Sequence, residues 1–406
     1  MLTRLAGFAV LPLLALVMPF LLMPIIGVLV GPEGWSSAIA GQSIGAIASV
    51  LVLWGWNVDG TVQVARAVTE DARAEVYARS VRTRLLLSVA IFPLAVVAAV
   101  LVARPGFADE ASAMALGYTL LGFSPAWYGI GVGKPSLLGL YDTLPRFAAT
   151  VTAAPLLLLT RTLWPFPVLM AVATAVSLWF FHRRFAPGRP WLPRDFRGAL
   201  ADLNAQRHTA GINMAGQVYA QTPTPIATAT TPALASGPLA TTDSLYRLGL
   251  FSAVALGNAF QGWTLEPGAP DRRRRHLAAI AAHAVLGVAG LVVLVLLGPP
   301  ISPLLSADAA PATTILCLYY GLAFAFLSAA TPLIRNLLIP AGRQRLVLRV
   351  TLVAAVIGLS VMLAAGLSGW VEGVALGMAA SELAMLLFLL PPALRVLNSA
   401  EGDPHA

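Results

Sequence analysis

Apolar residues dominate the chain in long runs, and short polar or arginine-bearing stretches separate these runs. About twelve runs are roughly 20 residues long, which is the length a helix needs to cross the hydrocarbon core of a membrane. Lipid offers the backbone no hydrogen-bond partner, so each run is expected to be an α-helix. The predicted spans cover residues 7–30, 36–56, 85–104, 111–132, 138–160, 163–182, 209–232, 237–263, 277–299, 311–338, 345–367 and 370–391.

The longest polar connection lies in the middle of the chain and carries three prolines and several arginines. It predicts an N-terminal six-helix bundle at residues 1–182, a cytoplasmic linker at 183–208 and a C-terminal six-helix bundle at 209–406. A faint internal repeat supports this division of the chain into two halves, because Pro24-Ile25 aligns with Pro225-Ile226. The expected fold is an all-α polytopic membrane protein with two bundles around a central cavity, where transporters of this kind place their substrate.

Basic residues are distributed unevenly between the connections. Of the 26 Lys and Arg residues, 22 precede the first span, follow an even-numbered span or follow the last one. Positive connections stay in the cytoplasm, so both termini are expected there and the protein is expected in the cytoplasmic (inner) membrane of a bacterium. This asymmetry accounts for the net charge of +8 without a nucleic-acid partner.

Composition excludes a soluble protein and several kinds of site. Hydrophobic residues make up 58% of the chain and charged residues 11%, whereas soluble domains carry about 25% charged residues. Cys317 is the single cysteine, which excludes an internal disulfide and a cysteine metal centre. The five histidines show no metal spacing, and no phosphate-binding glycine loop is present. We therefore expect no enzyme, catalytic residue, metal or cofactor.

Ionisable residues inside predicted spans are the main candidates for function, because their burial in a membrane is costly. Asp142 precedes Arg146 by four residues, and Asp243 precedes Arg247 by four, so each pair shares a helix face. Each pair either neutralises itself or presents its arginine to an anionic substrate, for which the planar guanidinium is suited. Glu382 has no basic partner in its span. Asp142, Asp243 and Glu382 are candidates for coupling to a proton or sodium ion.

A polar stripe runs along the predicted seventh span. Asn213, Gln217 and Gln221 recur every four residues and therefore face one direction, and Tyr219, Thr222 and Thr224 add to the polarity. A lipid-exposed helix would avoid such a stripe. Hydrogen bonding between helices and the lining of a sugar-binding cavity both explain it.

Several short motifs resemble a known transporter family. They are Leu11-Pro12 through Gly31-Pro32, Gly55-Trp56-Asn57-Val58-Asp59-Gly60 with Ala65-Arg66, Pro125-Ala126-Trp127-Tyr128 with Gly131 and Lys134, Ile339-Pro340-Ala341-Gly342-Arg343, and Gly373 through Glu382. Together they resemble the polysaccharide (O-antigen-type, Wzx-like) flippases of the multidrug/oligosaccharidyl-lipid/polysaccharide exporter superfamily. Ile130 and Gly133 replace a glutamine and an acid of the family pattern.

This resemblance implies a transporter that moves a lipid-linked (undecaprenyl-diphosphate) oligosaccharide across the membrane by alternating access. Arg146 and Arg247 would bind the diphosphate, and Asn213, Gln217 and Gln221 would bind the glycan. The lipid bilayer and the lipid-linked glycan are the expected partners, with glycosyltransferases or a polymerase of the same pathway as candidate protein partners.

Three other interpretations remain open. A drug or small-molecule cation antiporter of the same superfamily would favour an acidic cavity, and three intramembrane acids against two arginines do not decide between the two. A major-facilitator transporter also has six plus six spans, but its usual loop after span two is absent. A non-transporting scaffold could recruit glycan-synthesis enzymes through its arginine-rich connections.

Overall fold

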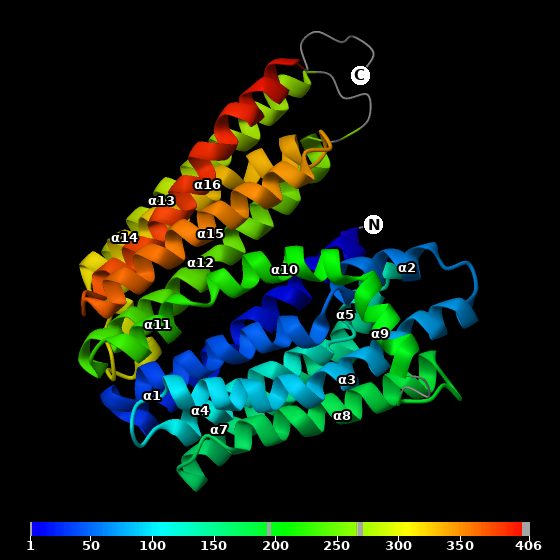
Figure 1. Ribbon diagram of the computed structural model, residues 1–406, viewed down its shortest axis with the longest axis horizontal. Coiled ribbons are helices and arrows are strands. Elements are labelled where there is room, and N and C mark those ends of the chain that lie inside the picture. The colour runs from blue at the N-terminus through cyan, green and yellow to red at the C-terminus, as the bar shows by residue number, and fades with distance from the viewer. Residues whose placement is uncertain (1, 193–195, 265, 267–270, 400–406) are drawn as a thin grey trace. The chain divides into compact units, whose positions relative to one another are not determined.

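The computed structural model consists of helices joined by short connections (Figure 1). It describes residues 2–192, 196–264, 266 and 271–399, except for the side chains of residues 2–19, 208, 212, 213, 262 and 399. Throughout these residues no strand occurs. The chain divides into two compact units, Met1–Gln221 and Thr222–Ala406. The all-α class predicted from the sequence is confirmed.

The first unit contains ten α-helices within its described residues. They are α1 (Leu2–Leu53), α2 (Thr61–Arg66), α3 (Glu70–Val102), α4 (Ala108–Thr119), α5 (Ala126–Gly131), α6 (Pro135–Leu138), α7 (Leu144–Thr160), α8 (Pro165–Phe185), α9 (Phe196–Ala205) and α10 (Arg207–Ala220). Two π-helical turns, η1 (Trp56–Gly60) and η3 (Gly139–Thr143), and one 3₁₀ turn, η2 (Leu120–Phe123), interrupt them.

The second unit contains six α-helices within its described residues. They are α11 (Pro223–Thr230), α12 (Ala233–Thr264), α13 (Arg272–Ser306), α14 (Thr314–Pro332), α15 (Gln344–Leu367) and α16 (Val371–Ser399). The π-helical turn η4 (Leu333–Leu338) continues α14.

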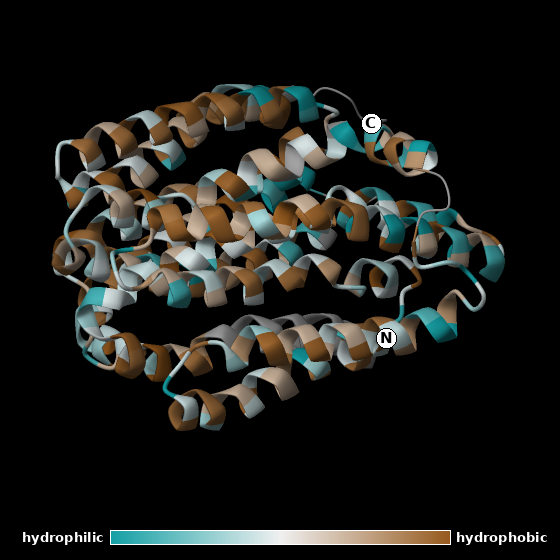
Figure 2. Ribbon diagram, turned by 60° about the horizontal axis from the view of Figure 1, so that its bottom comes forward, coloured by the Kyte–Doolittle hydropathy of each residue, from teal (hydrophilic) through white to brown (hydrophobic). Residues whose placement is uncertain are grey.

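Eight helical stretches of the described chain are long and apolar enough to cross a membrane, which makes this a multi-pass membrane protein. Figure 2 shows hydrophobic positions along the helices and hydrophilic positions gathered mainly near helix ends and connections. The difference from twelve predicted spans has local causes. The first two spans form one kinked helix, α1, and the fourth and seventh are each broken into shorter helices. The eighth, α12, carries too many polar residues to qualify.

Proline breaks the predicted seventh span. Pro223 and Pro225 follow Gln221 and Thr222, and proline lacks the N–H that would continue a helix. Helix α10 therefore ends at Ala220, and α11 starts at Pro223. The division between the two compact units falls between Gln221 and Thr222, inside the predicted span 209–232.

Two of the motifs that carried the family resemblance pack against each other. Trp56 of η1 lies with its ring centroid 5.8 Å from that of Trp127 in α5. The Trp56 indole donates a hydrogen bond of 2.9 Å to Thr83 Oγ1, and the Thr61 hydroxyl donates one of 3.2 Å to the Trp127 carbonyl. A Cβ atom on Gly60 would lie 2.8 Å from the Trp127 ring, so only glycine fits there. The side chains of these two motifs therefore pack η1, which follows α1, against α5.

The kink in α1 depends on Gly31. Its φ of 61° lies in the left-handed region, which costs an L-residue about 1–2 kcal/mol. Gly31→Ala is therefore expected to lower the free energy of unfolding by about 1–2 kcal/mol. Gly216→Ala is a matched control, because Gly216 lies inside α10 with open space around its Cβ position. Alanine there should raise stability by about 0.5–1 kcal/mol. Thermal unfolding of both variants in detergent checks the opposite signs, and equal shifts would contradict the assigned role of Gly31.

Candidate functional site

The first acid–base pair lies where η3 passes into α7. Arg146 Nη2 lies 2.5 Å from Asp142 Oδ1. The Ser124 hydroxyl donates a hydrogen bond of 2.6 Å to the same carboxylate oxygen. The Asp142 side chain is 10% exposed and that of Arg146 is 21% exposed. The carboxylate is thus buried and hydrogen-bonded, while about one fifth of the Arg146 side chain stays exposed.

Ser124 reaches Asp142 because the chain is not helical at this point. Between η2 and α5 the backbone of Ser124 turns extended, with φ −49° and ψ 129°, just before Pro125. The Ser124 hydroxyl also accepts a hydrogen bond of 3.1 Å from the Ala126 N–H. A cavity of about 20 Å³, lined by Ser124, Asp142 and Arg146, lies beside the pair. That volume has room for about one water molecule.

The second acid–base pair lies in α12 of the other unit. Asp243 is completely buried. Its Oδ2 accepts hydrogen bonds from Arg247 Nε at 3.0 Å and Nη2 at 2.7 Å, and a third from Thr224 Oγ1 at 2.9 Å. The phenol of Tyr320 in α14 interacts electrostatically with the same carboxylate. The Arg247 side chain is 19% exposed.

Both pairs are built alike although they stand at different places in the two units. In each, a buried carboxylate accepts an arginine from four residues later and a hydroxyl from a neighbouring segment. A buried carboxylate needs such partners, because it is strongly destabilising when left unpaired. A guanidinium carries five N–H donors, more than one carboxylate oxygen accepts. An arginine anchored in this way is therefore positioned to donate to an anion as well.

Glu382 is buried in α16. Its Oε2 atom has no hydrogen-bond partner among the described residues, and the same holds for the hydroxyl of the neighbouring Ser381. A buried carboxyl without a partner is costly, because no hydrogen bond replaces the water that it loses. The absence of a basic partner in its own helix, expected from the sequence, agrees with this environment.

The polar stripe of the predicted seventh span is divided between two helices. Gln217 is exposed on α10, and Gln221 lies half-buried just after that helix ends. The side chain of Asn213 lies outside the described residues. Thr224 belongs to α11, is fully buried and donates to Asp243. Part of the polarity in this segment therefore satisfies a buried acid instead of forming one continuous stripe.

Sequence reasoning missed the most deeply buried arginine. Arg84 was placed in a basic connection, but it lies inside α3 and is fully buried. Its guanidinium donates to the carbonyls of Ser80 at 3.1 Å and Ser124 at 3.1 Å, and to the Ser80 hydroxyl at 3.1 Å. It thus holds the broken segment that carries Ser124, and through Ser124 it is linked to Asp142. The sequence pattern does not predict this burial, because the Ser124 carbonyl belongs to a helix break 40 residues away.

Arg84→Met is expected to lower the free energy of unfolding by about 2 kcal/mol, because buried carbonyls lose their donor. Arg73→Met is a matched control on the same helix. Arg73 forms an exposed pair with Glu70 at 3.2 Å, and such pairs contribute about 0–1 kcal/mol. Thermal unfolding of the two variants measures the difference. A shift for Arg84→Met no larger than that for Arg73→Met would contradict the role given to Arg84.

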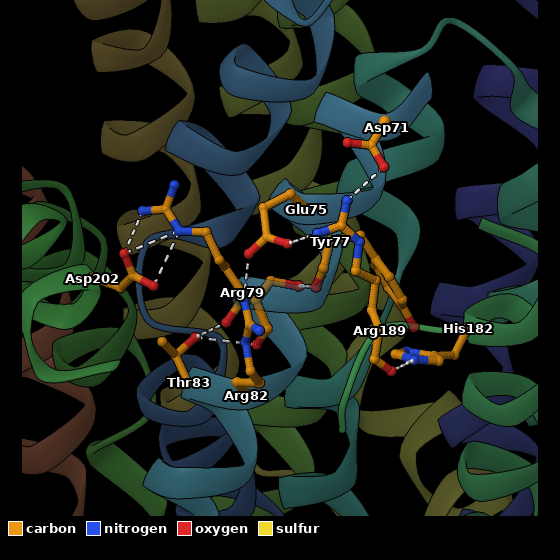
Figure 3. Close-up of polar contacts among 10 residues, drawn as sticks. Asp71, Glu75, Tyr77, Arg79, Arg82, Thr83, His182, Arg189 and Asp202 are labelled. Carbon is orange, nitrogen blue, oxygen red and sulfur yellow. Dashed lines mark hydrogen bonds and ion pairs between the residues drawn. The ribbon is translucent and has the colours of Figure 1, made fainter. Parts of the chain in front are cut away.

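A network of ion pairs joins α3 of the first unit to Arg189, which follows α8, and to α9 (Figure 3). Arg189 lies 2.5 Å from both Asp71 and Glu75, and Arg82 lies 2.5 Å from Glu75. Arg79 pairs with Asp202 and so joins α3 to α9. The hydrogen bond to Asp71 raises the pKa of the Arg189 guanidinium, which stays charged. These arginines are engaged in structural contacts as well as in the charge asymmetry of the sequence.

No group of three or more potential metal ligands among His, Cys, Asp and Glu occurs in the part of the chain that the structure describes.

Known proteins resemble this chain in structure and not detectably in sequence. No protein-family model and no curated protein matches it. The lipid II flippase MurJ, in an inward closed conformation, matches with a TM-score of 0.73 and 11% identity over 97% of this chain and 87% of its own. An inward-facing multidrug resistance MATE family transporter of the MOP superfamily matches with a TM-score of 0.64 and 16% identity, over 98% of this chain and 97% of its own.

A further match is a MOP superfamily transporter from Pyrococcus furiosus whose binding pocket is described as having reverse polarity. It has a TM-score of 0.56 and 11% identity, and covers 98% of this chain and 97% of its own. At such identities the likeness establishes the fold alone. The chain therefore has the fold of MOP superfamily transporters.

Proposed function

We propose that this protein is a membrane transporter that moves a lipid-linked oligosaccharide, carried on undecaprenyl diphosphate, across the cytoplasmic membrane by alternating access. Arg146 in the first unit and Arg247 in the second each supply a guanidinium for the diphosphate. Gln217, Gln221 and Asn213 bind the glycan, and Glu382, Asp142 or Asp243 couple transport to an ion gradient. Both termini lie in the cytoplasm, and enzymes that build or polymerise the glycan are candidate partners.

One observation carries this proposal. Each unit holds an arginine within its helical interior, anchored on a buried carboxylate and still about one fifth exposed. An arginine kept only to neutralise its own acid needs no exposed surface. Planar guanidinium groups suit a diphosphate because each can donate two parallel hydrogen bonds. The likeness to a lipid II flippase, whose substrate is named as a lipid, supports the same class.

The second candidate is export of a small cationic molecule, which the likeness to MATE family transporters favours. The buried acids Asp142, Asp243 and Glu382 would serve a cation, but the first two already accept hydrogen bonds from a hydroxyl and pair with an arginine. This arrangement leaves Glu382 as the one acid of the three without a basic partner among the described residues. The anionic substrate therefore fits the charges better.

Reconstituted proteoliposomes separate the two candidates. A fluorescent polyprenyl-diphosphate oligosaccharide placed in both leaflets should become fully accessible to a membrane-impermeant reagent only when the protein is present. A fluorescent phospholipid should stay in its leaflet, which excludes a general scramblase. Uptake of an organic cation driven by a proton or sodium gradient, with no movement of the lipid-linked sugar, would overturn the proposal in favour of the antiporter.

A further inference from the structure

Arg335 is a partly buried arginine of the second unit that belongs to neither acid–base pair. It lies in η4, within a helical stretch apolar enough to cross a membrane, where a charged group is costly. Its guanidinium rests against α12 at Gly257, where a Cβ atom would lie 2.9 Å from Arg335 Nη1. Its Nη2 atom donates to Asn258 Oδ1 at 2.7 Å and to Gln261 Oε1 at 3.0 Å. These contacts hold the side chain at one place on α12.

Arg335 lacks the carboxylate partner that Arg146 and Arg247 have. Among the described residues it forms no ion pair, and the titratable group that interacts with it electrostatically is His283 of α13, which brings no negative charge. Amide oxygens accept hydrogen bonds but carry no net charge, so they position the guanidinium without neutralising it. Charged groups in membrane-spanning segments usually pair with an opposite charge, and an anion would supply that charge here.

The donors around Arg335 are open to a ligand. Its Nε and Nη1 atoms donate to no described residue, and they keep accessible surface, because they are not among the enclosed unpaired atoms of the described chain. A guanidinium only donates, so Asn258 and Gln261 must present their amide oxygens to it and turn their NH₂ groups elsewhere. Asn258 is exposed and Gln261 is partly exposed. A fixed cation with neutral donors beside it suits a phosphate-type anion.

The face of α12 that holds Arg335 also carries Arg247. Asn258 and Gln261 follow Arg247 by 11 and 14 residues, which are about three and four helical turns, so all three project from one side of the helix. The point at which Asn258 holds Arg335 therefore lies about 16 Å along α12 from Arg247. It lies toward the end of α12 that leads to the arginine run 272–275, which the predicted topology places in the cytoplasm.

We propose that Arg335, with the amide groups of Asn258 and Gln261, forms a second position for a phosphate-type anion on the face of α12 that carries Arg247. The inference rests on the proposed function, under which this anion is the diphosphate of the lipid-linked substrate. Dissolved phosphate has the same chemistry and is the other source. In both cases the guanidinium donates charge-assisted hydrogen bonds from the N–H groups that the two amides leave unpaired.

Binding of inorganic pyrophosphate to the purified protein in a neutral detergent tests the position. The starting protein has both acid–base pairs neutralised by Arg146→Gln, Arg247→Gln, Asp142→Asn and Asp243→Asn, and saturable binding should remain in it. Adding Arg335→Gln should weaken that binding about tenfold or more, the effect of losing a charge-assisted hydrogen bond. Arg345→Gln is the matched control, because it removes an equal charge from an exposed position in α15. It should change the affinity less than about twofold.

Gln261→Glu separates anion binding from a purely structural role of Arg335. The added carboxylate gives the guanidinium a counter-charge within the protein, so the midpoint of thermal unfolding should stay the same or rise. The affinity for pyrophosphate should nevertheless fall about tenfold, because the position loses its net positive charge. Unchanged binding in this variant would overturn the proposal.

A short-chain polyprenyl diphosphate is the second probe and separates the two sources of the anion. If it binds more tightly than pyrophosphate and Arg335→Gln weakens its binding, the position serves the lipid-linked substrate; if pyrophosphate binds at least as tightly, the position serves a dissolved anion. A protein that moves no lipid-linked sugar but still binds pyrophosphate through Arg335 would contradict the proposed function alone. Saturation by neither probe, or equal weakening by Arg335→Gln and Arg345→Gln, would overturn the binding position itself.

Discussion

Replacing Arg247 by alanine should lower the free energy of unfolding by about 3–5 kcal/mol, the cost of leaving a buried charge without its partner. Asp243 is completely buried and would lose two of its three hydrogen bonds together with its positive partner. Thr224 alone cannot compensate a full negative charge. The loss of thermal stability in detergent, or resistance to a denaturing detergent, measures the effect.

Two comparisons isolate the buried charge as the cause. The double variant Asp243→Asn with Arg247→Met removes both charges at once, and it should recover most of the stability lost in Arg247→Ala. Arg79→Ala breaks the pair with Asp202, whose side chain is 19% exposed and can be hydrated, so its cost should be about 1 kcal/mol. A double variant as unstable as Arg247→Ala would show that packing, not charge, governs this position.

Transport should fall by a factor of about 100 or more when both arginines lose their charge, because each charge-assisted hydrogen bond to phosphate contributes about 1.5–3 kcal/mol. The informative variant replaces Arg146 and Arg247 by glutamine and, at the same time, Asp142 and Asp243 by asparagine. It leaves neither Asp142 nor Asp243 as a buried charge without its arginine, so the variant is expected to fold. Movement of the lipid-linked sugar in proteoliposomes, normalised to the amount of inserted protein, is the measurement.

The matched variant keeps both arginines and changes only Asp142 and Asp243 to asparagine. It should retain binding of the diphosphate, and any defect it shows reports on ion coupling. If it loses binding of the lipid-linked diphosphate as completely as the fourfold variant, the acids and not the arginines hold the substrate, and the cation antiporter becomes the better interpretation.

The sequence predicted the helical class and the acid–arginine pairs because both depend on local spacing. Long apolar runs require helices in lipid, and a separation of four residues places Asp243 and Arg247 on one face. The two ion pairs therefore followed from the sequence alone. The number of membrane spans could not be predicted from the apolar pattern in the same way. Pro125 and the Pro223–Pro225 pair break helices whose apolar pattern continues across the break.

The partners that come from distant segments could not be predicted. Ser124 and Thr224 each satisfy an acid roughly 20 residues away, and this depends on how a broken helix packs against its neighbour. Arg84 resembled any other arginine of a basic connection until the structure placed it among buried carbonyls. Likewise, Arg335 reaches Asn258 and Gln261 only because η4 and the end of α12 come together in the fold.

The affinity of the purified protein for a short-chain polyprenyl-diphosphate oligosaccharide tests the role of the two arginines most directly. We expect saturable binding by the natural protein and binding at least about 100-fold weaker in the fourfold neutral variant. Equal affinity of the natural protein and the fourfold variant would contradict the account, because the diphosphate would then be held by groups other than Arg146 and Arg247.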